Sequence, residues 1–207
     1  MIQRLKGMET VASRLTQFGE GARGRIQADF ERAGVAYPPE YVTLVAIKAQ
    51  RRLRVFAGTR EGTLQPIKDY PVLGQSGQLG PKLREGDHQV PEGLYEIEGL
   101  NPNSRFYVSL RLNYPNAWDL ARAGEEERHA PGSDIYIHGQ TASVGCLAMG
   151  DPAIEELFTL VADVGRTVPV IIAPVDFLAG EQAAPEPDSP PWLPRLYQDI
   201  DTALRAL

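Results

Sequence analysis

Near the N-terminus, apolar side chains recur at the three- and four-residue spacing of an amphipathic helix. The first group is Val11, Leu15 and Phe18, and after a glycine-containing stretch the second group is Ile26, Phe30 and Ala33. This spacing predicts two short helices between residues 8 and 34, interrupted at 19–24. We expect Gly34 and the Pro38-Pro39 pair to end the segment.

From residue 41 the pattern changes to β-rich apolar runs. Strands are predicted at 42–47, 53–56, 94–97, 106–112, 135–137 and 168–172. The second run follows a charged turn, as the hairpin partner of the first would. In the fourth run every second residue is apolar (Phe106, Val108, Leu110 and Leu112), so these side chains share one face of the strand.

Helical patterns return toward the C-terminus. Asp151 is a favoured N-cap, Pro152 a favoured first helical residue, and Gly165 ends the apolar stripe. Residues 180–194, rich in proline, alanine and acidic residues, are typical of a tether. Beyond it, a short helix that packs back on the domain is predicted from Trp192, Leu196, Ile200 and Leu204. The chain is therefore predicted to be mainly β with α, with helical ends.

Composition indicates an ordinary globular protein with one sizeable core. Of 207 residues, 43% are hydrophobic and 23% are charged, and the formal net charge is −6. An acidic chain lacks the basic face that nucleic-acid backbones require, so no nucleic-acid partner is expected. No apolar run reaches the roughly 20 residues of a membrane-spanning helix, so no transmembrane segment is expected.

The N-terminal stretch bears on location. Residues 1–7 carry positive charge without a hydrophobic stretch behind them, and as they stand they do not form a signal peptide. We expect a periplasmic or cell-envelope location if an export signal has been removed, and a cytoplasmic location otherwise.

The segment at 135–151 contains the candidate chemistry. A predicted strand ends at His138, and after a short polar loop the single cysteine, Cys146, follows Gly145 just before a helix. A thiol attacks a carbonyl as the thiolate and needs a base, which His138 can supply near neutral pH. Gly145 allows close backbone approach, and Ser143 can hydrogen-bond the substrate, the histidine or the turn. The alternative is a buried histidine and cysteine in a connecting turn, and the spacing alone favours neither.

At these residues the sequence resembles the YkuD family of L,D-transpeptidases, and more closely its YafK-like branch. The resemblance lies in Ile137-His138-Gly139 and in Ser143-Val144-Gly145-Cys146-Leu147-Ala148-Met149. Further similar stretches occur, in the same order, at 76–87, 89–93, 101–104 and 114–116. Together they cover roughly residues 41–175.

The resemblance implies a β-sandwich-like catalytic domain over 41–179, in which a helix follows the cysteine turn. Residues 1–40 then form a helical N-terminal extension, and 180–207 a Pro-rich tether with a C-terminal helix. It implies Cys146 as nucleophile, His138 as general base and acid, and amides near Gly145 and Cys146 as oxyanion donors. The implied partners are diaminopimelate-containing peptidoglycan stem peptides, with a cell-wall-linked protein as a further partner. The implied reaction passes through an acyl-thioester without metal or organic cofactor.

Three features differ from the wider family and fit the YafK-like branch. Val144 stands where many members have a second histidine, Ala148 stands where many have an arginine, and His138 precedes Cys146 by only eight residues (146 − 138). These differences keep other functions open. The first is an amide hydrolase that cuts peptidoglycan peptide or peptidoglycan–protein links, and the second is a non-catalytic cell-wall-binding module. A third function, suggested instead by the absence of a signal peptide in residues 1–7 as they stand, is a cytoplasmic cysteine hydrolase of recycled wall peptides.

Other polar residues are weaker candidates. Arg84 can hold a substrate carboxylate bidentately, and Lys82 lies in the same loop. Asn116, in a Pro-containing aromatic loop before Trp118, can bind substrate through its amide, with Gly139 as a further binding residue. We expect no role for His88 or His129, and no metal site, because the spacing of the three histidines and the acids matches no ligand pattern.

Overall fold

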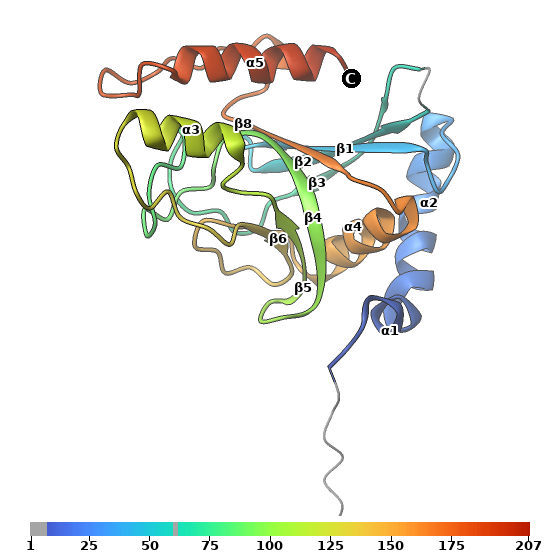
Figure 1. The fold of residues 1–207 in the computed structure, drawn as a ribbon. Coiled ribbons are helices and arrows are strands. Elements are labelled where there is room, and N and C mark those ends of the chain that lie inside the picture. Colours follow the sequence, from blue (N-terminus) through green and yellow to red (C-terminus); the bar gives the residue numbers. More distant parts are fainter. Residues whose placement is uncertain (1–7, 60–61) are drawn as a thin grey trace, which may run out of the picture.

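The computed structural model describes residues 8–59 and 62–207, so the charged stretch at 1–7 lies outside the described residues. Eight strands form one mixed sheet in the order β3-β2-β1-β8-β4-β5-β6-β7 (Figure 1). Their bounds are β1 Tyr41–Ile47, β2 Arg52–Gly58, β3 Gln65–Pro71, β4 Gly93–Ser104, β5 Tyr107–Leu112, β6 Tyr136–His138, β7 Leu147–Ala148 and β8 Pro169–Ala173. The expected fold class, mainly β with α, is confirmed.

The long strand β4 joins two parts of the sheet. Residues Gly93 to Glu96 pair with β8, while Ile97 to Ser104 pair with β5. Two neighbouring pairs, β1 with β8 and β6 with β7, are parallel. His138 is the last residue of β6, and Cys146 directly precedes β7. Both residues therefore lie at the edge of the sheet that β6 and β7 form.

The N-terminal helices form one continuous helical run, which corrects the prediction of two helices separated at 19–24. Helix α1 (Val11–Arg14) passes through a π-helical turn (Leu15–Gly19) into α2 (Glu20–Ala33). Gly19 and its neighbours keep right-handed helical dihedrals, because a glycine in a helix weakens it without breaking it. Gly34 ends α2 in the left-handed conformation, as expected.

Helix α4 (Asp151–Val164) follows the cysteine turn, but Asp151 is not its N-cap. Gly150 occupies the cap position with φ 78°, and Asp151 is the first helical residue. The Asp151 carboxylate instead accepts the amide of Gln140 at 2.8 Å. Gly165 ends the helix, as predicted. The aspartate therefore fastens the loop that follows β6 to the start of the helix.

Of the elements that the sequence analysis did not predict, strand β3 and helix α3 escaped for identifiable reasons. Strand β3 contains Pro66 and Pro71, which argue against a strand except at a sheet edge, where β3 lies. Helix α3 (Ala117–Glu125) begins at Asn116 with a capping box completed by Asp119. Only Ala123 of its nine residues is buried, so the short helix contributes little to the apolar core.

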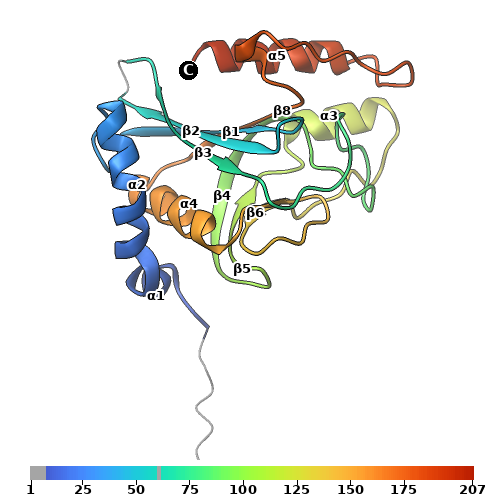
Figure 2. The ribbon, with the colours of Figure 1, turned by 180° about the vertical axis from the view of Figure 1, so that it is seen from behind.

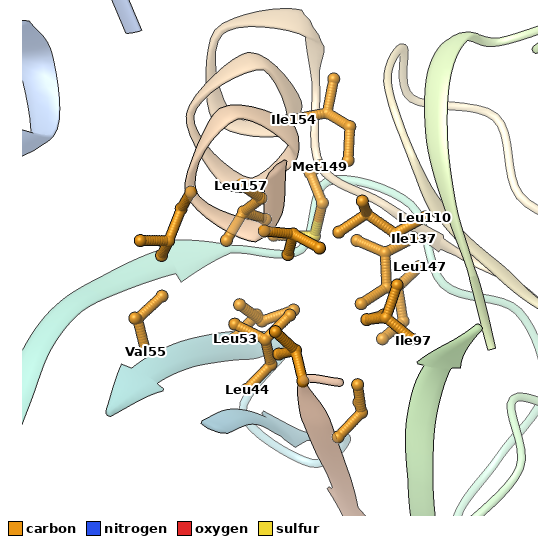
Figure 3. Close-up of a cluster of buried hydrophobic side chains, with 14 of the residues drawn as sticks. Leu44, Leu53, Val55, Ile97, Leu110, Ile137, Leu147, Met149, Ile154 and Leu157 are labelled. Carbon is orange, nitrogen blue, oxygen red and sulfur yellow. The ribbon is translucent and has the colours of Figure 1, made fainter. Parts of the chain in front are cut away.

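Two apolar cores lie on opposite faces of the sheet. The larger core joins β1, β2 and β5–β7 with α4, as the side chains of Leu44, Leu110, Ile137, Leu147 and Leu157 show (Figure 3). The smaller core lies under helix α5 (Leu193–Arg205), whose Leu196, Ile200 and Leu204 pack against β1, β2 and β8. Figures 1 and 2 show α5 on one side of the sheet and α2 and α4 on the other.

The predicted C-terminal helix is therefore present and packed on the sheet. A short 3-10 turn (Phe177–Ala179) precedes the segment that leads to it. Within residues 8–59 and 62–207, none of the helices is long and apolar enough to cross a bilayer. The division at 40/41 and 179/180 stays a prediction.

Candidate active site

Cys146 lies where the loop from β6 enters β7. The parallel register pairs Ile137 with Leu147 and His138 with Ala148, so Cys146 precedes the first paired residue of β7. Gly145 has φ 86°, and a Cβ there would lie 3.3 Å from the carbonyl oxygen of Gln89. The turn therefore needs glycine immediately before the cysteine.

The Cys146 thiol is buried, with 9% of the residue exposed. Its Sγ donates to the backbone carbonyl oxygen of Asp134 at 3.8 Å. Burial raises the pKa of the thiol, and the negative charge of Asp134 raises it further, whereas the Tyr136 amide and the positive charge of Lys82 act in the opposite direction. The resting group is consequently a neutral thiol at neutral pH.

His138 is held as a neutral imidazole. Only 1% of the residue is exposed, and burial lowers the pKa of its ring. Nδ1 lies 2.6 Å from the Gly139 carbonyl oxygen, and because a carbonyl only accepts, Nδ1 carries the proton and Nε2 is left as the basic nitrogen. The ring of Phe106 stacks on the imidazole, with centroids 4.6 Å apart. In the described chain, no hydrogen bond joins the Cys146 thiol to this ring.

Ser143 closes the cysteine turn with two hydrogen bonds. Its Oγ donates to the Cys146 carbonyl oxygen at 2.5 Å and accepts the Cys146 amide at 3.1 Å. The amide of Gly145 donates to Ser76 Oγ at 2.6 Å. Both amides expected to receive an oxyanion are therefore engaged by serine hydroxyls in this conformation.

Ser76 and Asp134 were not singled out in the sequence. Ser76 lies in one of the stretches that resemble the family, and its hydroxyl also donates to the carbonyl oxygen of His88 at 2.8 Å. Asp134 has φ 59° and an exposed carboxylate, paired with Arg111 at 3.4 Å. The sequence does not indicate that Ser76 and Asp134 lie near Cys146. Both residues belong to loops, and loops have no periodic pattern from which their position could be predicted.

Lys82 and Arg84 occupy the same loop but differ in environment. The Lys82 ammonium is buried and pairs with the Asp87 carboxylate at 2.5 Å, and it also donates to the Arg84 carbonyl oxygen at 2.9 Å. Its charge acts on the Cys146 thiol. Arg84 is exposed, and in the described chain its guanidinium has no ion-pair partner. Arg84 is therefore the cation in this loop that remains available to a bound anion.

Asn116 and Gly139 have structural positions that the sequence did not indicate. The Asn116 side-chain oxygen accepts the amides of Trp118 and Asp119, and its NH₂ donates to the Leu94 carbonyl oxygen. The side-chain oxygen thus caps α3, and the NH₂ group ties the cap to β4. Gly139 orients His138 through its carbonyl oxygen, and a Cβ there would lie 2.7 Å from Asp151 Oδ1.

The remaining histidines lie on exposed loops. His88 and His129 are both exposed. Over the described ranges, no cluster of three histidine, cysteine, aspartate or glutamate side chains is arranged to hold a metal ion. The chemical groups that the structure gathers are therefore a thiol, an imidazole, two serine hydroxyls and one buried ammonium.

Comparison with known proteins identifies the family to which this fold belongs. The model of the YkuD L,D-transpeptidase catalytic domain matches residues 40–172, and the chain belongs to this family. YafK of Escherichia coli (strain K12), whose name assigns it provisionally to the L,D-transpeptidases, is 36% identical over 125 residues. The match covers 59% of this chain and 47% of YafK. The chain thus spans about half the length of the curated relatives it matches, and the similarity supports the YafK-like branch.

Solved structures show the same fold. The helical cell shape determining protein Pgp2 from Campylobacter jejuni superposes with a TM-score of 0.54 at 23% identity, over 66% of this chain and 48% of Pgp2. A structure of the Pgp2 K307A mutant superposes with a TM-score of 0.53 at 18% identity, over 99% of this chain and 64% of that one. At these identities the likeness concerns the fold alone.

Proposed function

We propose that this domain is a cysteine-dependent acyltransferase that acts on diaminopimelate-containing peptidoglycan stem peptides through an acyl-thioester on Cys146. The observation that supports it best is that the β6–β7 unit holds both a buried thiol and a buried, neutral imidazole whose tautomer leaves Nε2 basic. Membership of the L,D-transpeptidase family supports the substrate class. The same membership supports a cell-envelope location.

Acylation begins when the thiol leaves the Asp134 carbonyl by rotation about its Cα–Cβ bond and turns toward His138 Nε2. The imidazole takes the S–H proton while sulfur attacks the scissile amide carbonyl, so the C–S bond forms as negative charge moves to the carbonyl oxygen. The C–N bond then breaks, and His138 gives its proton to the leaving amine. The product is the acyl-thioester and a free amine.

Deacylation reverses the roles of the same groups. An acceptor amine, or water, loses a proton to Nε2 as it attacks the thioester carbonyl. Sulfur leaves and recovers that proton from the imidazolium. An amine acceptor gives transpeptidation, and water gives hydrolysis.

Two features prepare the site for charge. Release of the Gly145 amide by Ser76, or of the Cys146 amide by Ser143, supplies an oxyanion donor. Arg84, exposed at the edge of the loop, binds a carboxylate of the stem peptide. A neutral resting pair also restrains the thiol until a substrate excludes water and positions its carbonyl.

Intact-mass spectrometry tests the proposal. The protein is incubated with a carbapenem and, separately, with disaccharide-tetrapeptide muropeptides. We expect a covalent adduct mapped to Cys146, with cross-linked products if an amine resolves the thioester and shortened or released peptides if water does. The Cys146→Ala variant is the control and forms no adduct.

The absence of both adduct and product with the wild-type protein would contradict the acyltransferase proposal. In that case peptidoglycan pull-down without a change in the muropeptide profile would favour a wall-binding module. Fractionation of cells that express the complete gene product would decide between a cell-envelope and a cytoplasmic enzyme.

A further inference from the structure

A fully buried ion pair lies beside the loop that faces the cysteine turn. Lys48 Nζ and Glu92 Oε1 are 2.9 Å apart, and both side chains are 0% exposed. Burying two charges costs free energy unless further hydrogen bonds satisfy both groups. The hydrogen-bond partners of Lys48 and Glu92 therefore indicate which part of the structure this pair stabilises.

Every polar atom of the pair is used, and most of the partners belong to one loop. Lys48 Nζ donates to the carbonyl oxygens of Gly80 at 2.8 Å and Val90 at 2.9 Å. Glu92 Oε1 accepts the amide of Gly80 at 2.7 Å. The pair thus holds both polar backbone atoms of Gly80 and one of Val90, near the middle and at the C-terminal end of a segment that lacks regular secondary structure.

That segment, residues 73–90, forms one wall of the cysteine turn. Gly74 exchanges two backbone hydrogen bonds with Ala148. Ser76 holds the Gly145 amide, and Lys82 acts electrostatically on the Cys146 thiol. The position of residues 73–90 therefore affects both the geometry and the charge around the nucleophile.

The C-terminal helix completes the arrangement. The Tyr197 hydroxyl, from α5, donates to Glu92 Oε2 at 2.8 Å. Tyr197 and Leu193 also line a cavity of ≈ 130 Å³ together with Leu79 and Gly80. Helix α5 lies outside the region matched by the family model, which ends at 172. It nevertheless contacts the Glu92 carboxylate, which binds the backbone of residues 73–90 at Gly80.

We infer that Lys48, Glu92 and Tyr197 form a buried clamp through which helix α5 positions residues 73–90 against Cys146. The three are positioning residues, because they act through Gly80, Val90 and the loop between them and do not contact the reacting atoms. The inference rests on the proposed function only for its effect on catalysis. The structural coupling between α5 and the cysteine turn is independent of it.

Tyr197→Phe tests the clamp, because it removes one hydroxyl and keeps the ring. The chain offers a matched control in Tyr70→Phe. Tyr70 is also a buried tyrosine that donates to a buried glutamate, Glu156 Oε2, at 2.7 Å. Its glutamate belongs to α4, and in the described part of the chain its hydrogen bonds and ion pairs go to Arg25, Lys68 and Tyr70, none of them in 73–90. The two variants therefore lose similar hydrogen bonds with different connections.

Two readouts separate positioning from general stability. For Tyr197→Phe we expect amide hydrogen exchange to become about tenfold faster within 73–90 and 143–148, the effect of losing one hydrogen bond that holds the loop. We also expect iodoacetamide to alkylate Cys146 faster across the pH profile, because a loosened loop admits water to the thiol. Tyr70→Phe leaves both readouts at wild-type values while lowering the unfolding temperature by a similar amount.

Equal behaviour of the two variants would overturn the inference, as would faster exchange in Tyr197→Phe that is confined to α5. Neither readout needs a peptidoglycan substrate. If wild-type protein forms no acyl adduct, the proposed function fails while the exchange and alkylation comparison still decides the clamp. If the adduct forms, acylation by a carbapenem is expected to slow in Tyr197→Phe and not in Tyr70→Phe.

Discussion

The Cys146 thiol makes its hydrogen bond to the backbone carbonyl of Asp134, at 3.8 Å, and the same residue places a carboxylate near the sulfur. The carbonyl stabilises the S–H form, and the carboxylate opposes the thiolate. Asp134 therefore acts on the nucleophile through both its main chain and its side chain, and both effects favour the neutral state.

Replacing Asp134 with asparagine separates the two effects. Asparagine tolerates the left-handed φ of 59° found here and leaves the carbonyl in place, so only the charge is lost. We expect the pKa of the Cys146 thiol to fall, which moves the pH profile of iodoacetamide alkylation toward lower pH. The exposed Asp188 in the 180–192 segment supplies the control, and Asp188→Asn should leave the profile in place. An unshifted profile in Asp134→Asn would show that the carboxylate has no influence on the thiol.

The stacking of Phe106 on His138 predicts a second titration effect. Burial is the main cause of the lowered pKa of His138, and the half-buried Phe106 ring covers one face of the imidazole. In Phe106→Ala water reaches that face, so we expect the pKa of His138 to rise toward its ordinary value of 6.5.

NMR titration of the histidine ring protons measures this directly. His88 and His129 are exposed and distant in sequence from Phe106, and their signals in the same spectra serve as internal controls. A His138 titration identical in wild type and Phe106→Ala would mean that other neighbours cause the depressed pKa. Because most of the imidazole stays neutral at pH 7, acyl transfer by the variant is expected to fall chiefly below the new pKa, so that the acid limb of its pH profile moves to higher pH than in the wild type.

Gly74 is a residue whose importance the motif does not indicate. A Cβ at this position would lie 2.0 Å from the Thr141 carbonyl oxygen and 3.1 Å from Ala148 Cβ. The nearest atoms belong to the backbone of Thr141, in the loop between β6 and β7. Making room for the Cβ would therefore separate this loop from Gly74 and disturb the Gly74–Ala148 pairing. We expect Gly74→Ala to lower the free energy of unfolding by about 3 kcal/mol, measured by urea denaturation, and to abolish adduct formation.

Gly124→Ala is the matched glycine control. Gly124 lies in α3, and a Cβ there would meet nothing within 4 Å. Alanine in an exposed helical position is expected to raise the free energy of unfolding by about 0.5–1 kcal/mol. A similar effect of the two substitutions would contradict the role given to the close approach at Gly74.

Much of the fold was predictable, because its core elements have clear periodic patterns. Strands β1, β2, β5 and β6 and helices α4 and α5 were predicted from apolar runs and caps. The predictions failed where the local sequence favours one structure and tertiary packing stabilises another. Glycines at 19–24 continue a helix that packing of Ala22, Ile26 and Phe30 stabilises, and the prolines of β3 are tolerated because the strand lies at an edge.

The residues of the candidate site also fall into two groups, those that the sequence predicted and those that it did not. His138, Ser143, Gly145 and Cys146 are adjacent in sequence, so the motif identified them together. Ser76, Phe106 and Asp134 reach the site through tertiary structure, and no spacing connects them to Cys146. Asn116 caps α3 through its side chain, a structural role that the sequence did not indicate, and its role in substrate binding stays a prediction.

Asp119, in the same cap, makes the stability of the protein depend on pH. Its carboxylate accepts the Tyr95 hydroxyl at 3.2 Å and the Asn116 amide at 3.0 Å. Burial outweighs these hydrogen bonds and raises the pKa of Asp119 from 3.8 to about 6. The folded protein therefore binds this proton more tightly than the unfolded chain does.

The sign of the effect follows from that difference. The contribution of Asp119 to stability is fully present below pH 4 and is lost as the pH rises through about 6. At about 1.4 kcal/mol for each pH unit of displacement, the loss amounts to about 3 kcal/mol. Asp119→Asn cannot titrate, so we expect the difference in unfolding free energy between wild type and variant to change by about this amount between pH 3 and pH 7, a window that extends beyond both pKa values, measured by urea denaturation. The Asp188→Asn variant should track the wild type, and a constant difference between wild type and Asp119→Asn would show that the carboxyl titrates normally in the folded state.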